Sequence, residues 1–439
     1  MYCFVENSWQ VKEEEMFDTV SIEKCSSYDY ESVLAALRKS VELVDGLSFV
    51  QPGMTIGIKT NLVAAMAPEK AATTHPIVLK ALCTMLLERG ASVVIGDSPG
   101  GLYTPAFVKN VYRTCGLTAL VDEIKAELAS GTLVKNELTS GDLINAEKIS
   151  DKGDVAVSLN EDFSISDGSF DGVSLKSFIY TGWLDKVDAI INFSKLKTHA
   201  MMGMSCAVKN MFGTIPGATK PEYHMRFPEE MAFANVMVDL NEFFKPALYV
   251  VDAIDGMEGN GPTAGEMRHI GAILASKRPY ALDMVCAKVI GMNINDVPTL
   301  TAAYERGLGP KDISEVTIEG TSVLSDVSVP DFKRATSHQS ITFEGDDLFS
   351  KLESKALKLA FSTRPNVKKS ECIGCKKCYE TCPAKAITMV PYSGKSISIP
   401  QIDRSKCIKC FCCQEFCPKG AMKVQENLLG KLVHKLNHK

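Results

Sequence analysis

The sequence has little that would carry the chain into a membrane or out of the cell. None of its apolar runs approaches the roughly 20 residues that span a bilayer. Residues 1–12 lack the basic-then-apolar order of a signal peptide. Charge of one sign is also missing, since 48 basic side chains stand against 53 acidic ones, and such a balance does not favour nucleic-acid binding. We therefore expect a cytoplasmic protein that binds neither a membrane nor nucleic acid.

Two common nucleotide-binding motifs are absent as well. Neither G-x-G-x-x-G nor the Walker A motif occurs, so the sequence gives little support to a nucleotide site. Apolar residues make up 45% and charged residues 23% of the chain, an ordinary globular mix that argues against disorder throughout. The length of 439 residues predicts two or three domains.

Cysteine is the residue type that stands out. The chain has 15 cysteines, and nine of them lie between Cys372 and Cys417. A long chain without a secretion signal seldom holds so many cysteines as disulfides, so metal binding is the first expectation. Residues 365–439 carry 14 basic and 5 acidic side chains, whereas residues 1–364 carry 34 basic and 48 acidic ones. The cysteine-rich part is therefore expected to be a separate module.

Eight of these cysteines form two runs with one spacing, C-x2-C-x2-C-x3-C-P. This is the bacterial ferredoxin pattern for two [4Fe-4S] clusters, in which the fourth cysteine of each run binds the other cluster. A zinc site is the alternative, but zinc usually takes its four ligands from two C-x2-C pairs. The first cluster is expected on Cys372, Cys375, Cys378 and Cys417, and the second on Cys382, Cys407, Cys410 and Cys413.

Upstream of the module, short apolar runs alternate with helical patterns. This alternation predicts an α/β domain with a parallel or mixed sheet, followed by a small α+β ferredoxin-like domain. The expected strands are 19–23, 54–59, 91–97, 188–193 and 247–254, and the expected helices are 76–89, 104–115, 231–244 and 280–290. The expected organisation is a loosely ordered leader at 1–15, the α/β domain at 16–324, a linker at 325–364 with a connecting helix at 346–359, the ferredoxin-like domain at 365–425, and a tail at 426–439.

Polar residues gather where the predicted strands end. In such sheets ligands bind beyond the carboxyl ends of the strands, which here means the loops after Lys59, Asp97, Phe193 and Ile254. The lysines after Phe193 suit an anionic substrate and proton transfer, unless they are solvated and the nearby glycines only turn the chain. The candidate catalytic residues are His75, Lys197, His199 and Lys209, and the candidate cofactor-binding residues are Lys59, Asn61, Asp97, Asn210, Asp252 and Asp255.

Cys206 lies in the same stretch and leaves two possibilities open. It is either a small packed thiol or a thiol whose pKa is lowered by Lys209.

Several segments resemble the DUF362 family of iron–sulfur proteins. They are KTNL at 59–62, GDSPGG at 96–101, KLKTH at 195–199, AVKNMFG at 207–213 and VVDAIDGMEGNGP at 250–262, with the paired cysteine runs after them. The resemblance covers most of residues 16–425. It implies the two-domain architecture and the clusters but no reaction, because the family name marks a domain of unknown function.

The stretch from His199 to Lys209, H-x3-G-x-S-x3-K, is similar to a motif of the nickel-pincer lactate racemase family. In that family the histidine moves protons and the lysine tethers the pincer cofactor. Thr74-His75-Pro76 resembles a further loop of the family, and His224 is a rough match for its nickel-binding histidine. The family's double glycine is Cys206-Ala207 here. The similarity implies a shared fold and a shared pocket position.

These features favour an iron–sulfur oxidoreductase or electron-transfer protein. Electrons would pass through two [4Fe-4S] clusters to an anionic substrate, a cofactor or a partner at the α/β domain, and the partner would be an electron donor or acceptor protein. One alternative is an electron-donating maturation or docking protein without substrate chemistry. A second alternative is a non-redox isomerase that resembles the racemases.

Overall fold

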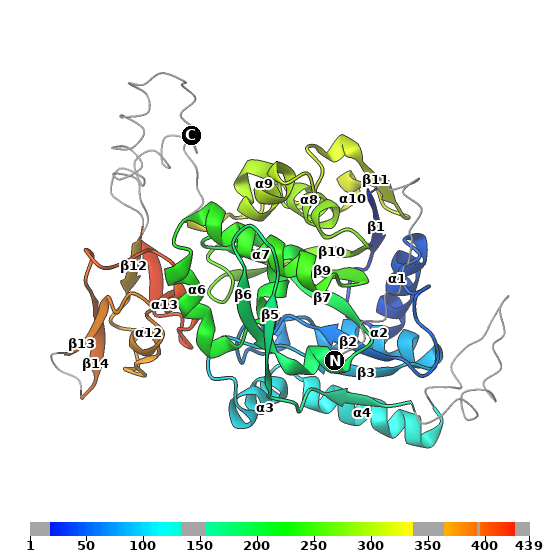
Figure 1. The fold of residues 1–439 in the computed structure, drawn as a ribbon, viewed down its shortest axis with the longest axis horizontal. Helices are drawn as coiled ribbons and strands as arrows, with labels where there is room; N and C mark the ends of the chain where they lie inside the picture. The colour runs from blue at the N-terminus through cyan, green and yellow to red at the C-terminus, as the bar shows by residue number, and fades with distance from the viewer. Residues whose placement is uncertain (1–17, 133–154, 337–363, 393–395, 426–439) are drawn as a thin grey trace.

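The structure, a computed structural model, describes residues 18–132, 155–336, 364–392 and 396–425 (Figure 1). The expected leader at 1–15, connecting helix at 346–359 and tail at 426–439 lie outside these residues. Within the described ranges, no helix is long and apolar enough to cross a membrane.

One large sheet forms the centre of the α/β domain. Its nine described strands follow the order β11-β1-β10-β9-β7-β2-β3-β4, with β8 attached to β7. Neighbours from β9 to β4 are parallel, whereas β10 is antiparallel to both β1 and β9. This confirms the expected α/β domain with a mixed sheet. The bounds are β1 Asp18–Lys24, β2 Thr55–Lys59, β3 Ser92–Gly96, β4 Val157–Leu159, β7 Ala189–His199, β8 Gly203–Ser205, β9 Leu248–Glu258, β10 Glu266–Ser276 and β11 Val316–Glu319.

Alternate residues of the central strands build cores on opposite faces of the sheet, because successive side chains of a strand point to opposite sides. In β9, Leu248 and Val250 pack with α1 and α2, whereas Tyr249 and Val251 pack with α8. Burial on both faces explains why these strands are almost continuously apolar in the sequence.

Helices cover both faces of this sheet (Figure 1). The first one-third of the chain supplies α1 to α4 on one face, and α5 to α10 lie on the other side with the β5–β6 hairpin. Pro76 opens α2 as expected, and Gly90, with a φ of 76°, follows its end. The bounds are α1 Tyr30–Leu43, α2 Pro76–Glu88, α3 Pro105–Thr114, α4 Leu117–Ser130, α5 Ala207–Asn210, α6 Lys220–Arg226, α7 Glu230–Phe244, α8 Pro279–Val289, α9 Pro298–Glu305, α10 Leu324–Val327, β5 Ile165–Ser169 and β6 Ser177–Thr181.

Two strands are longer than the sequence predicted. We expected a loop after Phe193, but β7 continues to His199, and β9 continues past Ile254 to Glu258. The polar residues of β7 read as a loop in the sequence. They are buried in the strand because partners are supplied by distant segments, such as Asp252 for Lys195.

The cysteine module is a small α+β unit, as expected, and its two halves repeat one backbone conformation. Left-handed residues recur at Gly374 and Lys409, and again at Lys385 and Gly420, with the spacing that separates Cys372 from Cys407. The same geometry at matching positions shows that the duplication of the cysteine runs extends to the path of the chain. The bounds are β12 Arg364–Val367, α12 Lys377–Glu380, β13 Ile387–Pro391, β14 Ser398–Ile402, α13 Cys412–Glu415 and β15 Met422–Gln425.

Candidate functional site

The thiols of the module lie close together, and which of them bind one cluster stays a prediction. One cavity is lined by Cys372, Cys375, Cys378 and Cys417, three cysteines of the first run and the last of the second. The pKa of Cys378 is raised to about 11, mainly by burial and next by the nearby thiols of Cys375, Cys417 and Cys372. Thiols of both runs surround Cys413, whose pKa is raised by burial and then by Cys410, Cys407, Cys378 and Cys382; of these, Cys378 is predicted to bind the first cluster.

Backbone amides point at the last sulfur of each run. The amide of Ala386 donates to the Sγ atom of Cys382 at 3.2 Å, and that of Ala421 donates to Cys417 at 3.1 Å. Such N–H···S bonds stabilise thiolates that bind iron, so these residues fit an iron–sulfur cluster. In the described ranges, no three His, Cys, Asp or Glu side chains are placed to hold a single metal ion.

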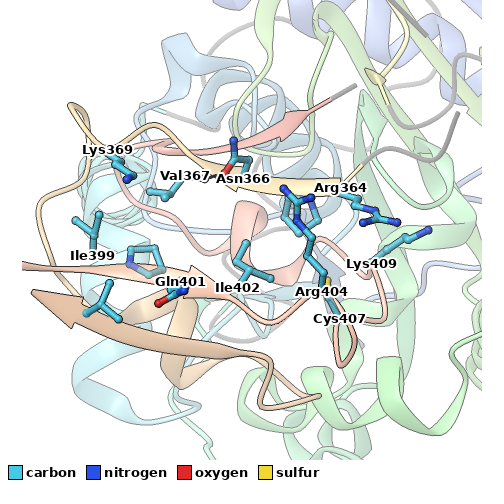
Figure 2. A pocket seen from close by; sticks show the side chains of 13 residues that line it. Arg364, Asn366, Val367, Lys369, Ile399, Gln401, Ile402, Arg404, Cys407 and Lys409 are labelled. Carbon is cyan, nitrogen blue, oxygen red and sulfur yellow. Dashed lines mark hydrogen bonds between the residues drawn. The ribbon is translucent and has the colours of Figure 1, made fainter. Parts of the chain in front are cut away.

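A groove of about 390 Å³ opens beside Cys407 on the same module (Figure 2). Pro365, Val367, Ile399 and Ile402 supply apolar lining, and Arg364, Lys369, Arg404 and Lys409 supply positive charge. In Figure 2, Arg364, Arg404 and Lys409 lie at the end of the groove next to Cys407, and Lys369 lies at the other end.

The second cysteine run contacts the α/β domain. The side-chain amide of Gln414 donates to the carbonyl of Asn260 at 2.8 Å, and the Thr263 hydroxyl donates to the carbonyl of Glu415 at 3.0 Å. Phe416 lies against Gly100, where a Cβ atom would come within 1.8 Å of the ring. The glycine therefore leaves the space that the phenylalanine ring fills, and Figure 1 shows the module beside the domain near α6.

Alanine at Gly100 is expected to loosen this contact, because the added methyl group overlaps Phe416 and overpacking costs about 1–3 kcal/mol. Hydrogen exchange of the full chain should then speed up at residues 260–263 and 412–416. The Phe416→Ala variant tests the same contact from the other side, because it removes the ring that packs on Gly100. Faster exchange is expected in both single variants, and exchange equal to that of the wild type in either would contradict the described contact.

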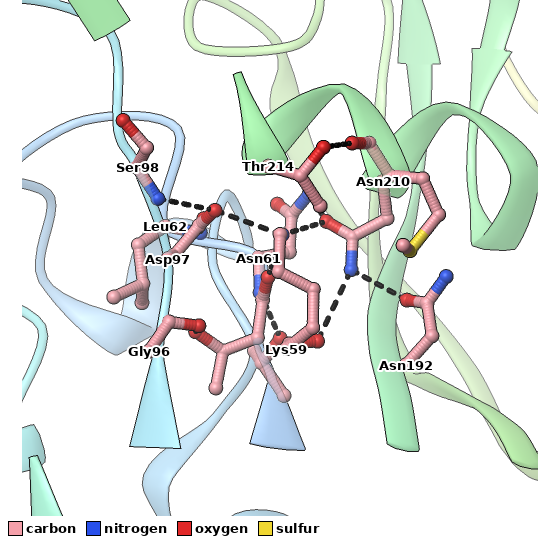
Figure 3. Close-up of polar contacts among 12 residues, drawn as sticks. Lys59, Asn61, Leu62, Gly96, Asp97, Ser98, Asn192, Asn210 and Thr214 are labelled. Carbon is pink, nitrogen blue, oxygen red and sulfur yellow. Dashed lines mark hydrogen bonds and ion pairs between the residues drawn. The ribbon is translucent and has the colours of Figure 1, made fainter. Parts of the chain in front are cut away.

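A buried polar network joins the carboxyl ends of β2 and β3 to α5 (Figure 3). The Lys59 ammonium pairs with Asp97 at 2.8 Å and donates to the side-chain oxygen of Asn210 at 3.2 Å. Asn61 donates to the same oxygen at 2.8 Å, and Asn210 donates to Asn192 at 2.7 Å. Asp97 also accepts the amides of residues 62 and 98 at 2.6 and 2.8 Å. The structure thus brings together four of the six predicted cofactor-binding residues, whose role stays a prediction.

Lys197 extends this network from β7. Its ammonium donates to the side-chain oxygen of Asn61 at 2.5 Å and to the carbonyl of Ala72. Burial, with Lys209 as the next cause, lowers the pKa of Lys197 to about 7. This lysine therefore lies close to the point where it gains or loses a proton at neutral pH.

The remaining predicted residues of this edge form a second, neighbouring group. Lys195 pairs with Asp252 at 3.0 Å and donates to the Tyr28 hydroxyl at 2.7 Å. Tyr28 stacks on the His75 ring with centroids 3.7 Å apart, and the amide of His75 donates to Asp252 at 3.1 Å. Asp255 is engaged elsewhere, since its carboxylate lies 2.8 Å from the ring of His269. His75 and Asp252 therefore share one site, and Asp255 lies beside it.

Lys209 faces the cysteine module rather than a carboxylate of its own domain. Burial lowers its pKa, while Glu415 and Cys412 of the second run raise it. Lys220 also lies in this region, where its ammonium donates to the carbonyl of Ser98 and where burial lowers its pKa to about 8. Lys220 and Glu415 could not be predicted as site residues, because nothing in the local pattern links a residue of the cysteine runs to a lysine about 200 residues away.

Two histidines predicted from the racemase similarity have different surroundings. His199 accepts the amides of Met201 and Met202 at its Nδ1 atom, both at 3.1 Å, which fixes its ring in the turn after β7. His224 is buried, stacks on Phe233, and has no described hydrogen-bond partner for its Nδ1 atom. Burial and then Lys209 lower the pKa of His224 to about 3, so its ring is neutral.

Cys206 is a packed thiol. Its pKa lies well above the ordinary value because the residue is buried next to Cys286 and Asp283. Of the two possibilities that the sequence left open, the packed thiol is confirmed and the lowering of its pKa by Lys209 is wrong, because the neighbouring carboxyl and thiol groups disfavour a thiolate. The carboxyl of Asp283 accepts the amides of Ala207 and Val208 at 2.8 and 3.0 Å and so ties this segment to α8.

The α/β sheet and the paired cysteine runs define an iron–sulfur protein with a ferredoxin-like module that gives it the capacity for electron transfer. The chain belongs to the family described as domain of unknown function DUF362, which matches residues 56–161 and 146–288. A second description, 4Fe-4S dicluster domain, matches residues 371–421.

One relative is a thylakoid-associated protein of Synechocystis sp., which is 29% identical over 298 residues, or 67% of this chain and 81% of the relative. Among solved structures, the lactate racemase apoprotein of Thermoanaerobacterium thermosaccharolyticum shows a weak similarity, with a TM-score of 0.34 and 13% identity. That match covers 62% of this chain, and this chain spans 57% of the length of the racemase.

Proposed function

We propose that the chain is an iron–sulfur oxidoreductase that reduces or oxidises an anionic substrate or cofactor held between α13 and the lysines of the α/β domain. Two bound [4Fe-4S] clusters would supply single electrons, and the residues of the chain hold the anion and exchange protons with it. An electron donor or acceptor protein and a cytoplasmic setting belong to the same proposal.

The position of α13 is the observation that carries this proposal. Its Cys413 is an expected ligand of the second cluster, and its Glu415 acts electrostatically on Lys197, Lys209 and Lys220. Three of the four expected ligands of the second cluster belong to the run that contacts the α/β domain. The expected source of electrons and these buried or half-buried lysines thus lie at a single interface.

The lysines at this interface suit an anion. Lys59 and Lys195 have carboxylate partners at 2.8 and 3.0 Å, whereas Lys197, Lys209 and Lys220 form no ion pair with a described carboxylate. Lys197 is buried, and Lys209 and Lys220 are half-buried. Ammonium groups withdrawn from water without a counter-ion are costly, and an anionic ligand would reduce that cost. With a pKa of about 7, Lys197 can give a proton to a reduced substrate or take one from it.

The first test is the metal content. Anaerobic reconstitution of the full chain is expected to give about eight iron atoms per chain, as two four-iron clusters require. A protein that binds zinc instead, or only one cluster, would contradict the proposal at its base.

The second test replaces Lys209 with methionine, which keeps the length of the side chain but removes its charge. Reoxidation of the reduced, iron-loaded protein would be followed with nitrite, sulfite and fumarate as oxidants. For an anion that reoxidises the wild type, the variant is expected to need a concentration about tenfold higher or more to reach half of its maximal rate. The reason is that a hydrogen bond to a charged group contributes about 1.5–3 kcal/mol. The reduction potential of one cluster should also fall, since a nearby positive charge favours the reduced form.

The exposed Lys311 offers the matched control, because methionine there removes an equal charge far from both groups of thiols in the sequence. Its reoxidation rates and cluster potentials are expected to equal those of the wild type. Unchanged rates and potentials in the Lys209 variant, or turnover that survives the loss of both clusters, would refute the proposed route.

A further inference from the structure

The groove beside Cys407 gathers positive charge that the described structure does not neutralise. Arg364, Lys369, Arg404 and Lys409 line it, and none of the four forms an ion pair with a described carboxylate. Nearby lysines of the same module differ in this respect, since Lys368 and Lys406 pair with Glu371 and Asp403 at 2.5 and 3.8 Å. The module thus pairs several of its basic side chains with carboxylates and gathers four unpaired ones in this groove.

Like charges held together destabilise a fold, and surface clefts with one sign of charge attract partners of the opposite sign. The electrostatic repulsion is largest where the positive side chains are closest, and Figure 2 shows Arg364, Arg404 and Lys409 together at one end of the groove. The groove lining at that end includes Cys407, an expected ligand of the second cluster. The positive charge is therefore concentrated where an electron would enter or leave the module.

We propose that this groove is the docking surface for an acidic one-electron carrier protein. The carrier would lose one electron and one cluster of the module would gain it, with no bond made or broken. The inference rests on the proposed function for its clusters. The groove is a different surface from the one that contacts the α/β domain, since those contacts come from residues 414–416 of α13 and the turn after it.

The shape of the groove favours a protein over a small anion. It spans two β ribbons, with Arg364, Arg404 and Lys409 at one end and Lys369 at the other, so one phosphate or carboxylate cannot contact all four side chains. A protein surface with several carboxylates matches such a spread. Residues 365–439 also carry 14 basic against 5 acidic side chains, which would steer an acidic partner toward the module.

The test compares two double variants with the same change in charge. Arg364→Glu/Arg404→Glu reverses the groove, and Lys377→Glu/Lys419→Glu reverses two exposed lysines elsewhere on the module. Iron content and cluster EPR spectra would first be matched to the wild type. Binding is then measured by calorimetry between the oxidised, iron-loaded protein and oxidised flavodoxin, an acidic carrier, at several salt concentrations.

The groove variant is expected to bind flavodoxin about tenfold or more weakly at low salt and to lose most of the salt dependence. The Lys377→Glu/Lys419→Glu variant should keep affinity close to that of the wild type. Reduction by the small cation methyl viologen should be unchanged or faster in the groove variant, while reduction by flavodoxin slows.

Equal weakening in both variants, or undiminished binding in the groove variant, would overturn the docking proposal. Inorganic pyrophosphate would be added to the wild type in an amount equimolar with the protein. If it weakens flavodoxin binding as much as the groove variant does, the docking proposal would also be overturned, in favour of a small-anion site. These outcomes are separate from the proposed substrate reaction, because binding is measured between oxidised partners and does not depend on Lys209.

Discussion

Replacing Asp97 with asparagine is expected to lower the free energy of unfolding by about 3–5 kcal/mol, the usual cost of breaking a buried ion pair by removing one partner. Asp97 is 3% exposed and is the carboxylate that pairs with Lys59, whose side chain is fully buried. Asparagine keeps the size of the side chain but only one of the two oxygens that separately accept the amides of residues 62 and 98. The loss therefore measures the uncompensated charge of Lys59 together with one lost backbone hydrogen bond, and not a cavity.

The size of this loss should depend on pH. Burial lowers the pKa of Lys59, and Asp97 opposes that shift, so the variant will have a still lower pKa at Lys59. The unfolded chain then binds a proton that the folded chain has released, and stability rises with pH in that range. The difference in the free energy of unfolding between the variant and the wild type is thus expected to decrease as the pH increases from 7 to 9.

Urea unfolding of the full chain, followed by the fluorescence of the buried Trp183, would measure both effects, because Trp183 contacts the β3 residue Gly96 next to Asp97. The control is Asp171→Asn, which removes a carboxylate from a solvent-exposed pair with Lys176. That substitution is expected to have no measurable effect. An Asp97 variant as stable as the control would show that the Lys59–Asp97 pair does not hold this edge of the sheet together.

Part of the site could be predicted because it follows from the direction of the strands. β2, β3 and β7 are parallel neighbours, so their carboxyl ends meet at one edge of the sheet. The residues just after two apolar runs, Lys59 and Asp97, are therefore neighbours although 38 positions separate them. The cysteine spacing was informative for a different reason: a cluster binds several cysteines of one run, and this restricts the spacing within that run.

The rest depends on contacts that no local pattern encodes. Lys195 and Lys197 resemble loop residues in the sequence, and partners from distant segments, such as Asp252 and Asn61, make their burial within β7 possible. Glu415 acts on the lysines of the site because the module docks there, in part through a glycine, Gly100, that leaves room for a ring. Docking of this kind depends on the shape of two surfaces, which composition and periodicity do not describe.

Pairwise replacement of cysteines is expected to show that each cluster takes ligands from both runs. In the structure, Cys378 has Cys417 among its nearest thiols, and Cys413 has Cys382. The helices that carry Cys378 and Cys413, α12 and α13, pack against each other, which brings the two runs together. We therefore expect each run to supply its last sulfur to the cluster that the other run holds.

Two double variants separate this arrangement from ligation within each run. If ligation crosses the runs, Cys372→Ala/Cys417→Ala removes two ligands of one cluster, and iron should fall from about eight to about four atoms per chain. Cys372→Ala/Cys382→Ala removes one ligand from each cluster, so both clusters should be lost or degraded. Alanine is preferred to serine because a hydroxyl oxygen can bind iron in place of the thiolate.

Ligation within each run predicts the opposite order, because Cys372 and Cys382 would then belong to one cluster and Cys417 to the other. Iron analysis and EPR of the reduced proteins distinguish the two orders without knowledge of any substrate. The surviving cluster of the Cys372→Ala/Cys417→Ala variant should be the one that uses Cys382, Cys407, Cys410 and Cys413. Because Cys413 lies in α13, this variant should keep the cluster whose reduction potential changes when Lys209 is replaced. If the potential of the remaining cluster does not change on that replacement, the lysines lie beside the other cluster.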